Sequence, residues 1–376
     1  MSLTPGPRKT PFLFLGNTRE YFKIWIVNVF FTLVTLGIYS AWATVRTKRY
    51  FYGNTLLNNA SFEYLTEPAD LLKGRMASAG ALLLYVVVTR FAPQTAPIFF
   101  AIFALAVPWL VGRGLGLALS NTRYCGLHFG FRGHYLRAFA VFVLLPAIPV
   151  AVVVAVALAG AGGGPERFPL LAWVALVAAA LSYPCFVARK EKYLAEHASY
   201  GDTMFGISLQ RQDLYSLHFK AFAGFVLLLL LSGLMAEMLF GTARVAGAAT
   251  GHLAWETGRI AALAVMCLLG LVALNGYIST IAANLVLNHT QLAGGRLMST
   301  TNPWNMAWIM LTNALAVVFS IGLLIPWARI RVTRYRLYNL SLLAEDNVHH
   351  FVAQAKSRTK VLDEGASKPY DATLAM

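Results

Sequence analysis

The chain has 376 residues, with 31 Lys and Arg against 16 Asp and Glu, which gives a formal net charge of +15. Hydrophobic residues make up 58% of the sequence and charged residues only 12%, whereas a soluble domain carries about 25% charged residues. This composition excludes an ordinary soluble protein and a disordered one. Three cysteines are too few for a disulfide-rich scaffold.

Eight apolar stretches approach the length of about 20 residues that a transmembrane helix needs. In chain order they are residues 24–45, 77–92, 98–112, 138–161, 168–188, 221–240, 259–281 and 306–328. The pattern predicts an all-α polytopic membrane protein, with short β or turn elements on the cytoplasmic side. We expect one membrane domain over residues 1–345 and a polar, disordered tail over residues 350–376.

One sequence unit recurs in five degenerate copies, an arrangement that indicates an internally repeated fold. Unit one spans residues 42–64, and shifts of 67, 143, 235 and 285 residues give units two to five, near 109–131, 185–207, 277–299 and 327–349. Unit three has Cys185 in place of the leading tryptophan, and unit four has lost the first arginine. The N-terminus repeats the end of the unit, since Phe12 and Phe14 match Phe62 and Tyr64 at a shift of 50.

In the better preserved units an aromatic residue ends an apolar run and a cation follows one turn later. That order is typical of a helix leaving the bilayer, with its ring among the headgroups. The Phe-x-Phe alternation that follows predicts a short strand. The set either anchors helices at the interface or binds lipid headgroups or another anion. Its candidate members are Trp42, Arg46, Arg49, Tyr50, Asn54, Trp109, Arg113, Asn121, Arg189, Lys192, Tyr193, Trp327, Arg331, Arg334, Tyr335 and Asn339.

The first and last apolar stretches pose a topological question, because units one and five each contain only one stretch. If 24–45 and 306–328 are simple spans, unit five lies on the opposite membrane face from unit one. If both re-enter, 27 of the 31 Lys and Arg lie inside, because Arg90, Arg167, Arg244 and Arg259 alone remain outside. The positive-inside rule favours the second arrangement, and both arrangements stay open.

Three polar residues are candidates for a site at membrane depth: Asn28, Asn313 and Glu237. A carboxylate in an apolar stretch is a functional candidate, although Glu237 also lies near the expected end of its helix. For the two asparagines the alternative is an interhelical hydrogen bond.

The runs EYFKIWIVNVFFTLVTLGIYSAWATVRTKRYFYGNT and SIGLLIPWARIRVTRYRLYN resemble the YjgN-like family of bacterial inner-membrane proteins. That family has a domain of unknown function. The resemblance covers roughly residues 12–345 and implies a multi-pass protein of the bacterial inner membrane. It implies no activity, substrate or catalytic residue.

The sequence points first to a transporter or channel-like protein for a lipid or a small amphipathic or anionic solute. The alternative is a non-transporting scaffold whose units bind anionic lipid or a protein partner. No credible nucleophile, base or metal cluster indicates an enzyme, and we expect neither a metal nor a cofactor. Because the cations are spread over membrane-flanking loops, nucleic acid is not an expected partner.

Overall fold

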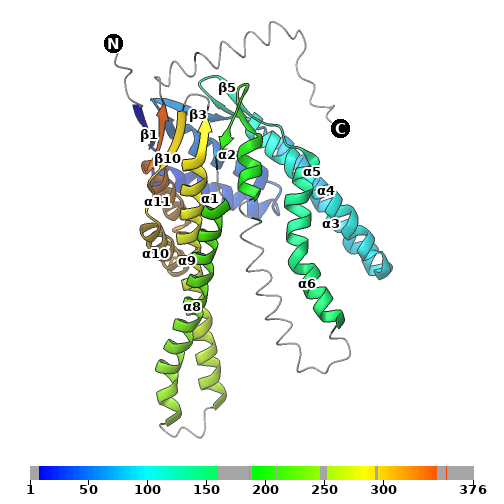
Figure 1. Cartoon of the computed structure of the whole chain (residues 1–376), viewed down its shortest axis with the longest axis vertical. Coiled ribbons are helices and arrows are strands. Elements are labelled where there is room, and N and C mark those ends of the chain that lie inside the picture. The colour runs from blue at the N-terminus through cyan, green and yellow to red at the C-terminus, as the bar shows by residue number, and fades with distance from the viewer. Residues whose placement is uncertain are drawn as a thin grey trace.

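A computed structural model describes residues 8–159, 186, 189–208, 211–245, 252–292, 295–344 and 353. Short strands gather at one end, and helices extend away from them (Figure 1). The predicted tail at 350–376 lies outside the described residues apart from residue 353, and the stretch at 168–188 lies outside them apart from residue 186.

Eleven strands form one antiparallel sheet in the order β7-β6-β5-β4-β3-β2-β1-β11-β10-β9-β8. The strands are β1 (Arg8–Phe14), β2 (Thr55–Leu57), β3 (Ala60–Tyr64), β4 (Thr122–Tyr124), β5 (Leu127–Phe131), β6 (Ala198–Tyr200), β7 (Thr203–Met204), β8 (Gly206–Ile207), β9 (Thr290–Leu292), β10 (Gly295–Ser299) and β11 (Leu340–Ala344). The terminal strands β1 and β11 pair with each other, and only Phe205 separates β7 from β8. The chain itself therefore closes the sheet, which we call the sheet ring.

The same strand register recurs at five places around the sheet ring. The pairs nearest the helices are Phe14–Thr55, Tyr64–Thr122, Phe131–Ala198, Ile207–Thr290 and Ser299–Leu340. Each pair joins the strand that precedes a helical segment to the strand that follows that same segment. All helices therefore leave the sheet ring at one edge, and the turns between strands lie at the other edge.

Aromatic and aliphatic side chains fill the inside of the sheet ring. The buried cluster consists of Phe12, Leu57, Tyr124, Leu127, Tyr200 and Leu342. The rings of Phe62 and Tyr124 stack with centroids 4.6 Å apart, and those of Phe129 and Tyr200 lie 5.0 Å apart. These residues alternate along their strands, so one face of each strand points inward. The interior is a packed apolar core.

Two-residue turns fix this register at the outer edge. Asn58 and Asn59 have φ of 49° and 61°, and Cys125 and Gly126 have φ of 49° and 84°. Two successive left-handed residues form the hairpin turn that matches the natural twist of paired strands. The run NTLLNN (54–59) thus contains strand β2 and the turn that follows it.

Five helical segments are long and apolar enough to cross a membrane: Pro68–Phe91, Pro93–Ser120, Tyr135–Val152, Tyr215–Met235 and Ala261–His289. They belong to α3 (Pro68–Phe91), η1 (Pro93–Thr95), α4 (Ala96–Ser120), α5 (Tyr135–Phe139), η2 (Ala140–Leu144), α6 (Leu145–Ala159), α8 (Arg211–Val245) and α9 (His252–His289). Between 0% and 17% of each apolar window is buried inside the structure. Their surfaces are therefore exposed, as a bilayer would require.

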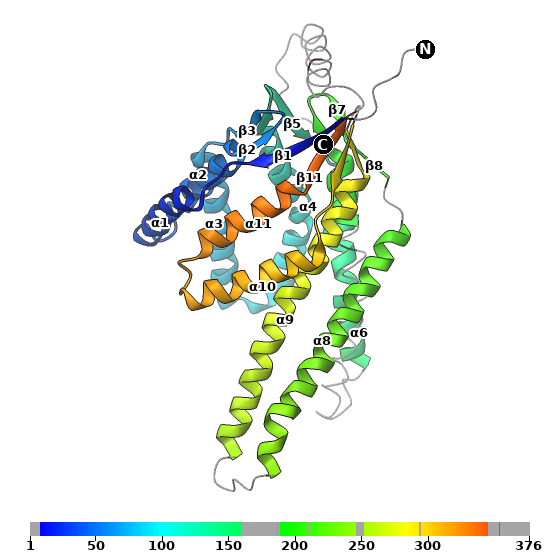
Figure 2. The ribbon, with the colours of Figure 1, turned by 90° about the vertical axis from the view of Figure 1, so that its left-hand side faces the viewer.

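The first and last stretches form short helical hairpins. The N-terminal hairpin consists of α1 (Thr18–Val34) and α2 (Ser40–Gly53), and the C-terminal hairpin of α10 (Pro303–Phe319) and α11 (Ile325–Tyr338). Gly37 and Gly322 sit in the connecting turns with φ of 93° and 87°, a conformation that strains any residue with a Cβ atom. Figure 2 shows both hairpins on the same side of the molecule, and α10 of the C-terminal hairpin packs against the long helix α9.

The structure corrects two expectations about fold class. The prediction of an all-α protein is wrong, because the eleven-stranded sheet ring organises the helices. Strands of two to seven residues carry too little local signal to reveal that they join one sheet. The count of eight helical segments is not confirmed either: the described residues hold five, and 24–45 and 306–328 each break into two helices.

Truncating the packed interior should destabilise the fold. Phe12 is 8% exposed, whereas its neighbour Leu13 is 45% exposed on the outer face. We expect Phe12→Ala to lower the free energy of unfolding by about 3–5 kcal/mol, because it leaves a cavity in the core. Leu13→Ala is the matched control and should cost far less. Thermal unfolding in detergent measures both variants, and equal losses would contradict an interior packed around Phe12.

Candidate functional site

Each predicted unit places its polar residues where a helix meets the sheet ring. Asn54 follows α2 and its Nδ2 atom donates to the backbone oxygen of Tyr50 at 2.8 Å. Asn339 follows α11 and donates in the same way to Tyr335 at 2.8 Å. Asn121 occupies the equivalent position after α4. These asparagines therefore terminate helices.

Three tyrosines join the returning helix to the start of the outgoing one. The backbone N–H of Asn17, which caps α1, donates to the Tyr50 hydroxyl at 2.7 Å. Asn302, which caps α10, contacts Tyr335 similarly at 3.3 Å. The Tyr193 hydroxyl donates to the backbone oxygen of His134, ahead of α5, at 3.4 Å. Burial is the main cause that raises the pKa of Tyr50 and of Tyr193, so each hydroxyl remains a neutral partner.

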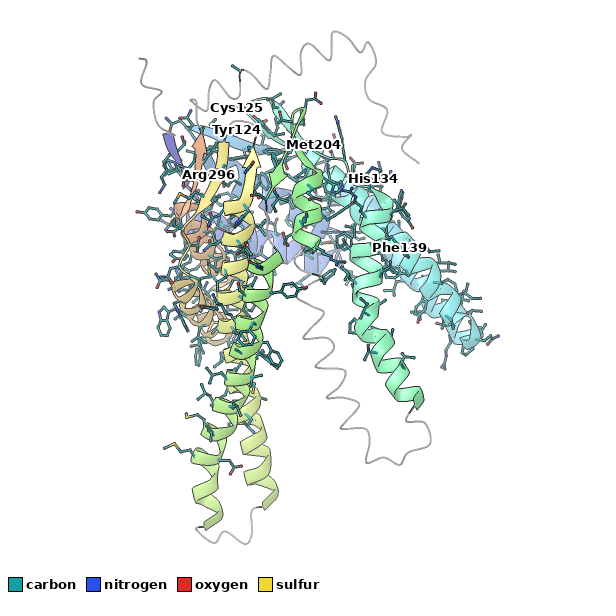
Figure 3. All side chains as sticks on the ribbon, viewed as in Figure 1. Tyr124, Cys125, His134, Phe139, Met204 and Arg296 are labelled. Atoms are coloured by element: carbon teal, nitrogen blue, oxygen red, sulfur yellow. The ribbon has the colours of Figure 1, made fainter. Side chains whose placement is uncertain are left out.

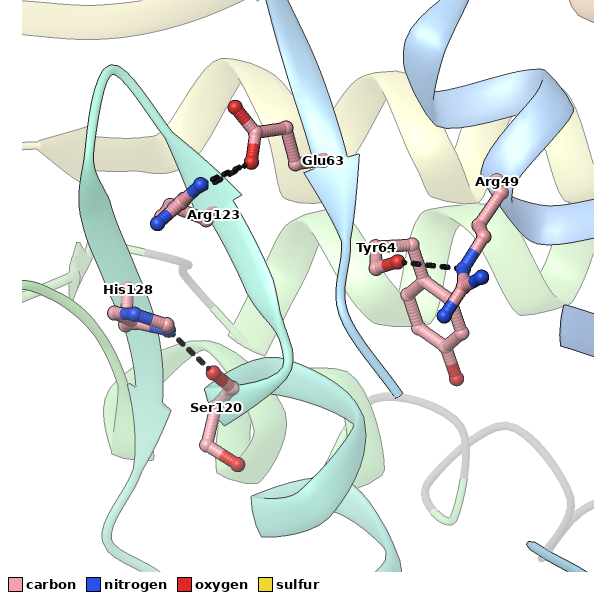
Figure 4. Close-up of polar contacts among 6 residues, drawn as sticks. All are labelled: Arg49, Glu63, Tyr64, Ser120, Arg123 and His128. Atoms are coloured by element: carbon pink, nitrogen blue, oxygen red, sulfur yellow. Dashed lines mark hydrogen bonds and ion pairs between the residues drawn. The ribbon is translucent and has the colours of Figure 1, made fainter. Parts of the chain in front are cut away.

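The second cation of the unit clamps the corner where a strand turns into a helix. Arg49 donates to the backbone oxygen of Tyr64 (Figure 4) and to that of Thr66, both at 3.2 Å. Arg334 donates to the backbone oxygen of Gly16 at 3.0 Å. Carbonyl oxygens at such corners lack strand partners, and a guanidinium satisfies them. These two arginines are held by the protein itself.

Asn284 performs the same task in unit four, and the sequence analysis missed it. Its Nδ2 atom donates to the backbone oxygen of Thr301 at 2.7 Å. The shift of 235 residues places Asn284 at the position of Arg49. The repeat pattern therefore already marked Asn284 as the equivalent residue of unit four. Lys192 occupies this position in unit three and instead pairs with Glu196 at 3.5 Å.

The first cation of the unit is exposed in units one, two and three. The guanidinium of Arg113 lies over the Trp109 ring, and that of Arg331 over the Trp327 ring, each 5.1 Å from the ring centroid. Arg46 and Trp42 are exposed in unit one, and Arg189 is exposed in unit three. Arg46, Arg113 and Arg189 make no hydrogen bond or ion pair with another described residue. We call Arg46, Arg113 and Arg189 the outer arginines; Arg331 is half-buried and donates to Thr312 and Asn313 within its own hairpin.

The two asparagines expected at membrane depth lie inside the short hairpins. Asn28 is 5% exposed, and its Nδ2 atom donates to the backbone oxygen of Ala43 at 3.4 Å. Asn313 is also 5% exposed, and it donates to the backbone oxygen of Ala328 at 3.3 Å and accepts from Arg331 at 3.0 Å. Each amide therefore ties the outgoing helix to the returning one.

Glu237 lies apart from Asn28 and Asn313. It lies on α8, two residues beyond the apolar window that ends at Met235. This part of α8 lies far from the sheet ring, whereas both short hairpins adjoin it (Figure 2). The three residues predicted for a polar membrane-depth site thus do not form one site.

The sheet ring holds phenol hydroxyls that support its structure. Figure 3 shows Tyr124 beside Cys125 in the sheet ring. The Tyr124 hydroxyl donates to the backbone oxygen of Leu57 at 2.7 Å, and that of Tyr200 donates to the backbone oxygen of Tyr124 at 2.9 Å. Burial raises the pKa of both phenols. Within the described residues no group of three His, Cys, Asp or Glu side chains is arranged to hold a metal ion.

Comparison with known proteins identifies the family. The chain belongs to the family described as bacterial protein of unknown function (DUF898), whose model matches residues 9–368. It is 24% identical over 348 residues to inner membrane protein YjgN of Salmonella typhimurium, covering 87% of each chain. A segment of 53 residues is 47% identical to inner membrane protein YjgN of Escherichia coli K12, covering 14% of this chain and 13% of the relative. No solved structure matches.

These findings confirm the family resemblance and the location. The relatives are named as inner-membrane proteins, and the chain has five helical segments of spanning length. The protein is therefore a multi-pass protein of the bacterial inner membrane, and its exposed helices contact the lipid bilayer.

Replacing an arginine that donates to backbone oxygens where a strand meets a helix should destabilise the fold, whereas replacing an outer arginine should not. We expect Arg49→Gln to lower the free energy of unfolding by about 1.5–3 kcal/mol, because two backbone oxygens lose a charged donor. Arg46→Gln is the matched control, three residues away, and should change stability by less than about 0.5 kcal/mol. Thermal unfolding in detergent compares them. Equal destabilisation would contradict the division into clamping and outward cations.

The buried phenols should make stability depend on alkaline pH. A phenol whose pKa is raised by folding favours the folded state below its unfolded pKa of about 10. That contribution is lost as the pH rises above this value, because the unfolded chain ionises first. We expect the unfolding temperature to decline above about pH 10, and Tyr124→Phe combined with Tyr200→Phe to reduce the decline. An unchanged alkaline profile in the double variant would argue against this assignment.

Proposed function

We propose that this inner-membrane protein is a non-transporting scaffold that binds anionic lipid headgroups through its outer arginines. The supporting observation is the division of its cations into two sets. Arg49 and Arg334 are used by backbone oxygens of the protein, whereas Arg46, Arg113 and Arg189 face outward beside the sheet ring. Arginines in the second set are available to a phosphate group.

We infer that the five units are degenerate repeats of one building block, each a strand pair joined to its helices. The recurring register of the sheet ring supports this, because equivalent residues pair at all five junctions. Such an arrangement distributes the outer arginines around the edge from which the helices leave. One protein would then contact several headgroups at once, which raises total affinity beyond that of any single contact.

The proposed orientation places the sheet ring in the cytoplasm. If every helical hairpin returns to the edge that it left, 27 of the 31 Lys and Arg lie on the side of the sheet ring. The positive-inside rule then assigns that side to the cytoplasm. The cytoplasmic leaflet carries anionic lipids, and each Lys or Arg near such a surface contributes about 1 kcal/mol to binding. The outer arginines suit this surface in charge and position.

The structure gives less support to a transport function. A solute path through the middle of the sheet ring would meet the core around Phe12, Tyr124 and Tyr200. The Asn313 amide and the Asn28 amide nitrogen are engaged within their own hairpins, whereas the buried Asn28 Oδ1 atom has no hydrogen-bond partner among the described residues. A transported molecule would then have to move along the exposed apolar surfaces of the long helices. Such a surface suits a lipid more than a soluble ion. Lipid transport is therefore the alternative that an experiment must separate from scaffolding.

Lipid binding can be tested with two charge-matched double variants. Arg46→Gln with Arg113→Gln removes two outer arginines, and Lys9→Gln with Arg296→Gln removes two cations from the strands. Affinity for fluorescent phosphatidylglycerol is measured in zwitterionic detergent micelles. At about 1 kcal/mol per cation, the first variant should bind about 10- to 30-fold more weakly than the native protein. The second variant should bind like the native protein.

Three results would overturn the proposal. Unchanged affinity in the Arg46→Gln, Arg113→Gln variant would show that the outer arginines serve only as membrane anchors. Accelerated movement of phosphatidylglycerol between leaflets, in vesicles containing the purified native protein, would establish lipid transport. Binding that is insensitive to salt would also contradict an electrostatic contact at an exposed surface.

A further inference from the structure

The two short hairpins lie against each other although they come from opposite ends of the chain. Helices α1 and α11 are in contact, and Arg329 of α11 donates to the Tyr21 hydroxyl of α1 at 3.1 Å. The clamp from Arg334 to the backbone oxygen of Gly16 adds a second connection. Figure 2 shows the hairpins projecting from the sheet ring on one side. They act as a single structural element, which we call the hairpin pair.

The hairpin pair has a charge-free length that is too short to cross a bilayer. No charged residue lies between Lys23 and Arg46, or between Arg296 and Arg329. From Lys23 to the turn at Leu36 the helix rises about 20 Å, at about 1.5 Å per residue. The returning helix α2 has about 9 Å between Ser40 and Arg46. The returning helix α11 has only about 6 Å between Ile325 and Arg329. One leaflet supplies about half of a hydrocarbon core that is about 30 Å thick, so the short returning helices keep both turns within one leaflet.

The turns of the hairpin pair present large apolar side chains outward. Leu36 and Ile321 are each 94% exposed with respect to the described residues. The helix ends beside them add Leu33, Val34, Val318 and Phe319, all exposed. Contiguous apolar surface of this kind on a protein indicates a membrane or a protein partner. The chain builds these turns from left-handed residues, so the exposed tips are a fixed feature of the fold.

The polar groups within the hairpin pair turn inward. Asn28 and Asn313 donate across their hairpins, and Arg331 donates to Thr312 at 2.8 Å and to Asn313 at 3.0 Å. At the turns, Gly37 donates to the backbone oxygen of Thr32 and Gly322 to that of Val317, each at 2.8 Å. Backbone that leaves a helix inside a bilayer needs such internal partners. The chemistry of the hairpin pair thus matches a hydrocarbon environment.

We propose that the hairpin pair inserts as one wedge into the leaflet next to the sheet ring, without crossing the membrane. The partner of the exposed tips is the acyl-chain layer of that leaflet. Leu36 and Ile321 would lie among the acyl chains, while Arg46 and Arg331 return to the headgroups. The wedge adds volume to one leaflet beside the long helices that span both. This proposal rests on the hairpin geometry and is independent of the outer arginines as a lipid-binding site.

Insertion depth can be measured with a fluorophore at each tip. In a cysteine-free background, Leu36→Cys and Ile321→Cys are labelled separately with a nitrobenzoxadiazole maleimide and reconstituted into phosphatidylcholine–phosphatidylglycerol vesicles. Leu83→Cys, at an exposed position in the middle of α3, is the control for a spanning helix. Ser61→Cys, on the exposed side of β3, is the control for the aqueous sheet ring. Spin-labelled lipids carry the quencher at the headgroup, or along the acyl chain, in one leaflet at a time.

The wedge predicts that both tips are quenched by acyl-chain spin labels in the leaflet on the sheet-ring side and far less by those in the opposite leaflet. Leu83→Cys should be quenched from both leaflets, and Ser61→Cys from neither. Equal quenching of a tip from both leaflets, or preferential quenching by headgroup labels of the opposite leaflet, would show that the stretches span. Absence of lipid quenching at both tips would show that protein covers them. Either result overturns the proposal without bearing on lipid binding by the outer arginines.

Discussion

The architecture depends on one constraint, the pairing of strands from every part of the chain into a single eleven-stranded sheet. β1 and β11 bring the two ends of the chain together, and the short β7–β8 connection completes the circuit. Because the register is the same at each junction, every helix must start and finish at one edge of the sheet ring. That edge then determines where the helices enter the membrane and where the cations of the units lie.

The two cations of a unit lie within one helix turn of each other but point in different directions. A cation that points toward the sheet ring, such as Arg49, completes the hydrogen bonds of a corner. A cation three residues earlier, such as Arg46, points outward beside an exposed tryptophan. The same residue type therefore stabilises the fold at one position and offers charge to the membrane surface at the other. The arginine that completes the corner and the arginine that faces outward are therefore adjacent but separable side chains.

The sequence predicted apolar helices and short strands after them, because each leaves a local pattern. It left open whether 24–45 and 306–328 span or re-enter, and it did not predict that each stretch breaks into two helices. The sheet ring was not predictable, since Phe12 and Leu57 show no local sign that they pair with each other. Nor could spacing alone separate Arg49 from Arg46, because the backbone oxygens of Tyr64 and Thr66 become available only in the folded corner.

The central claim is that all five units lie on one face of the membrane, and cysteine accessibility tests it most directly. In a cysteine-free background, single cysteines replace Lys9, Ser61, Gln291 and Leu343, which flank the two short hairpins, and Arg90 at the far end of α3. A membrane-impermeant maleimide is applied to the cytoplasmic membrane of spheroplasts, before and after it is opened. The account predicts that the first four react only after opening and that the cysteine at position 90 reacts before it. Reaction of Lys9→Cys and Ser61→Cys from opposite faces would contradict the sheet ring as the organising element.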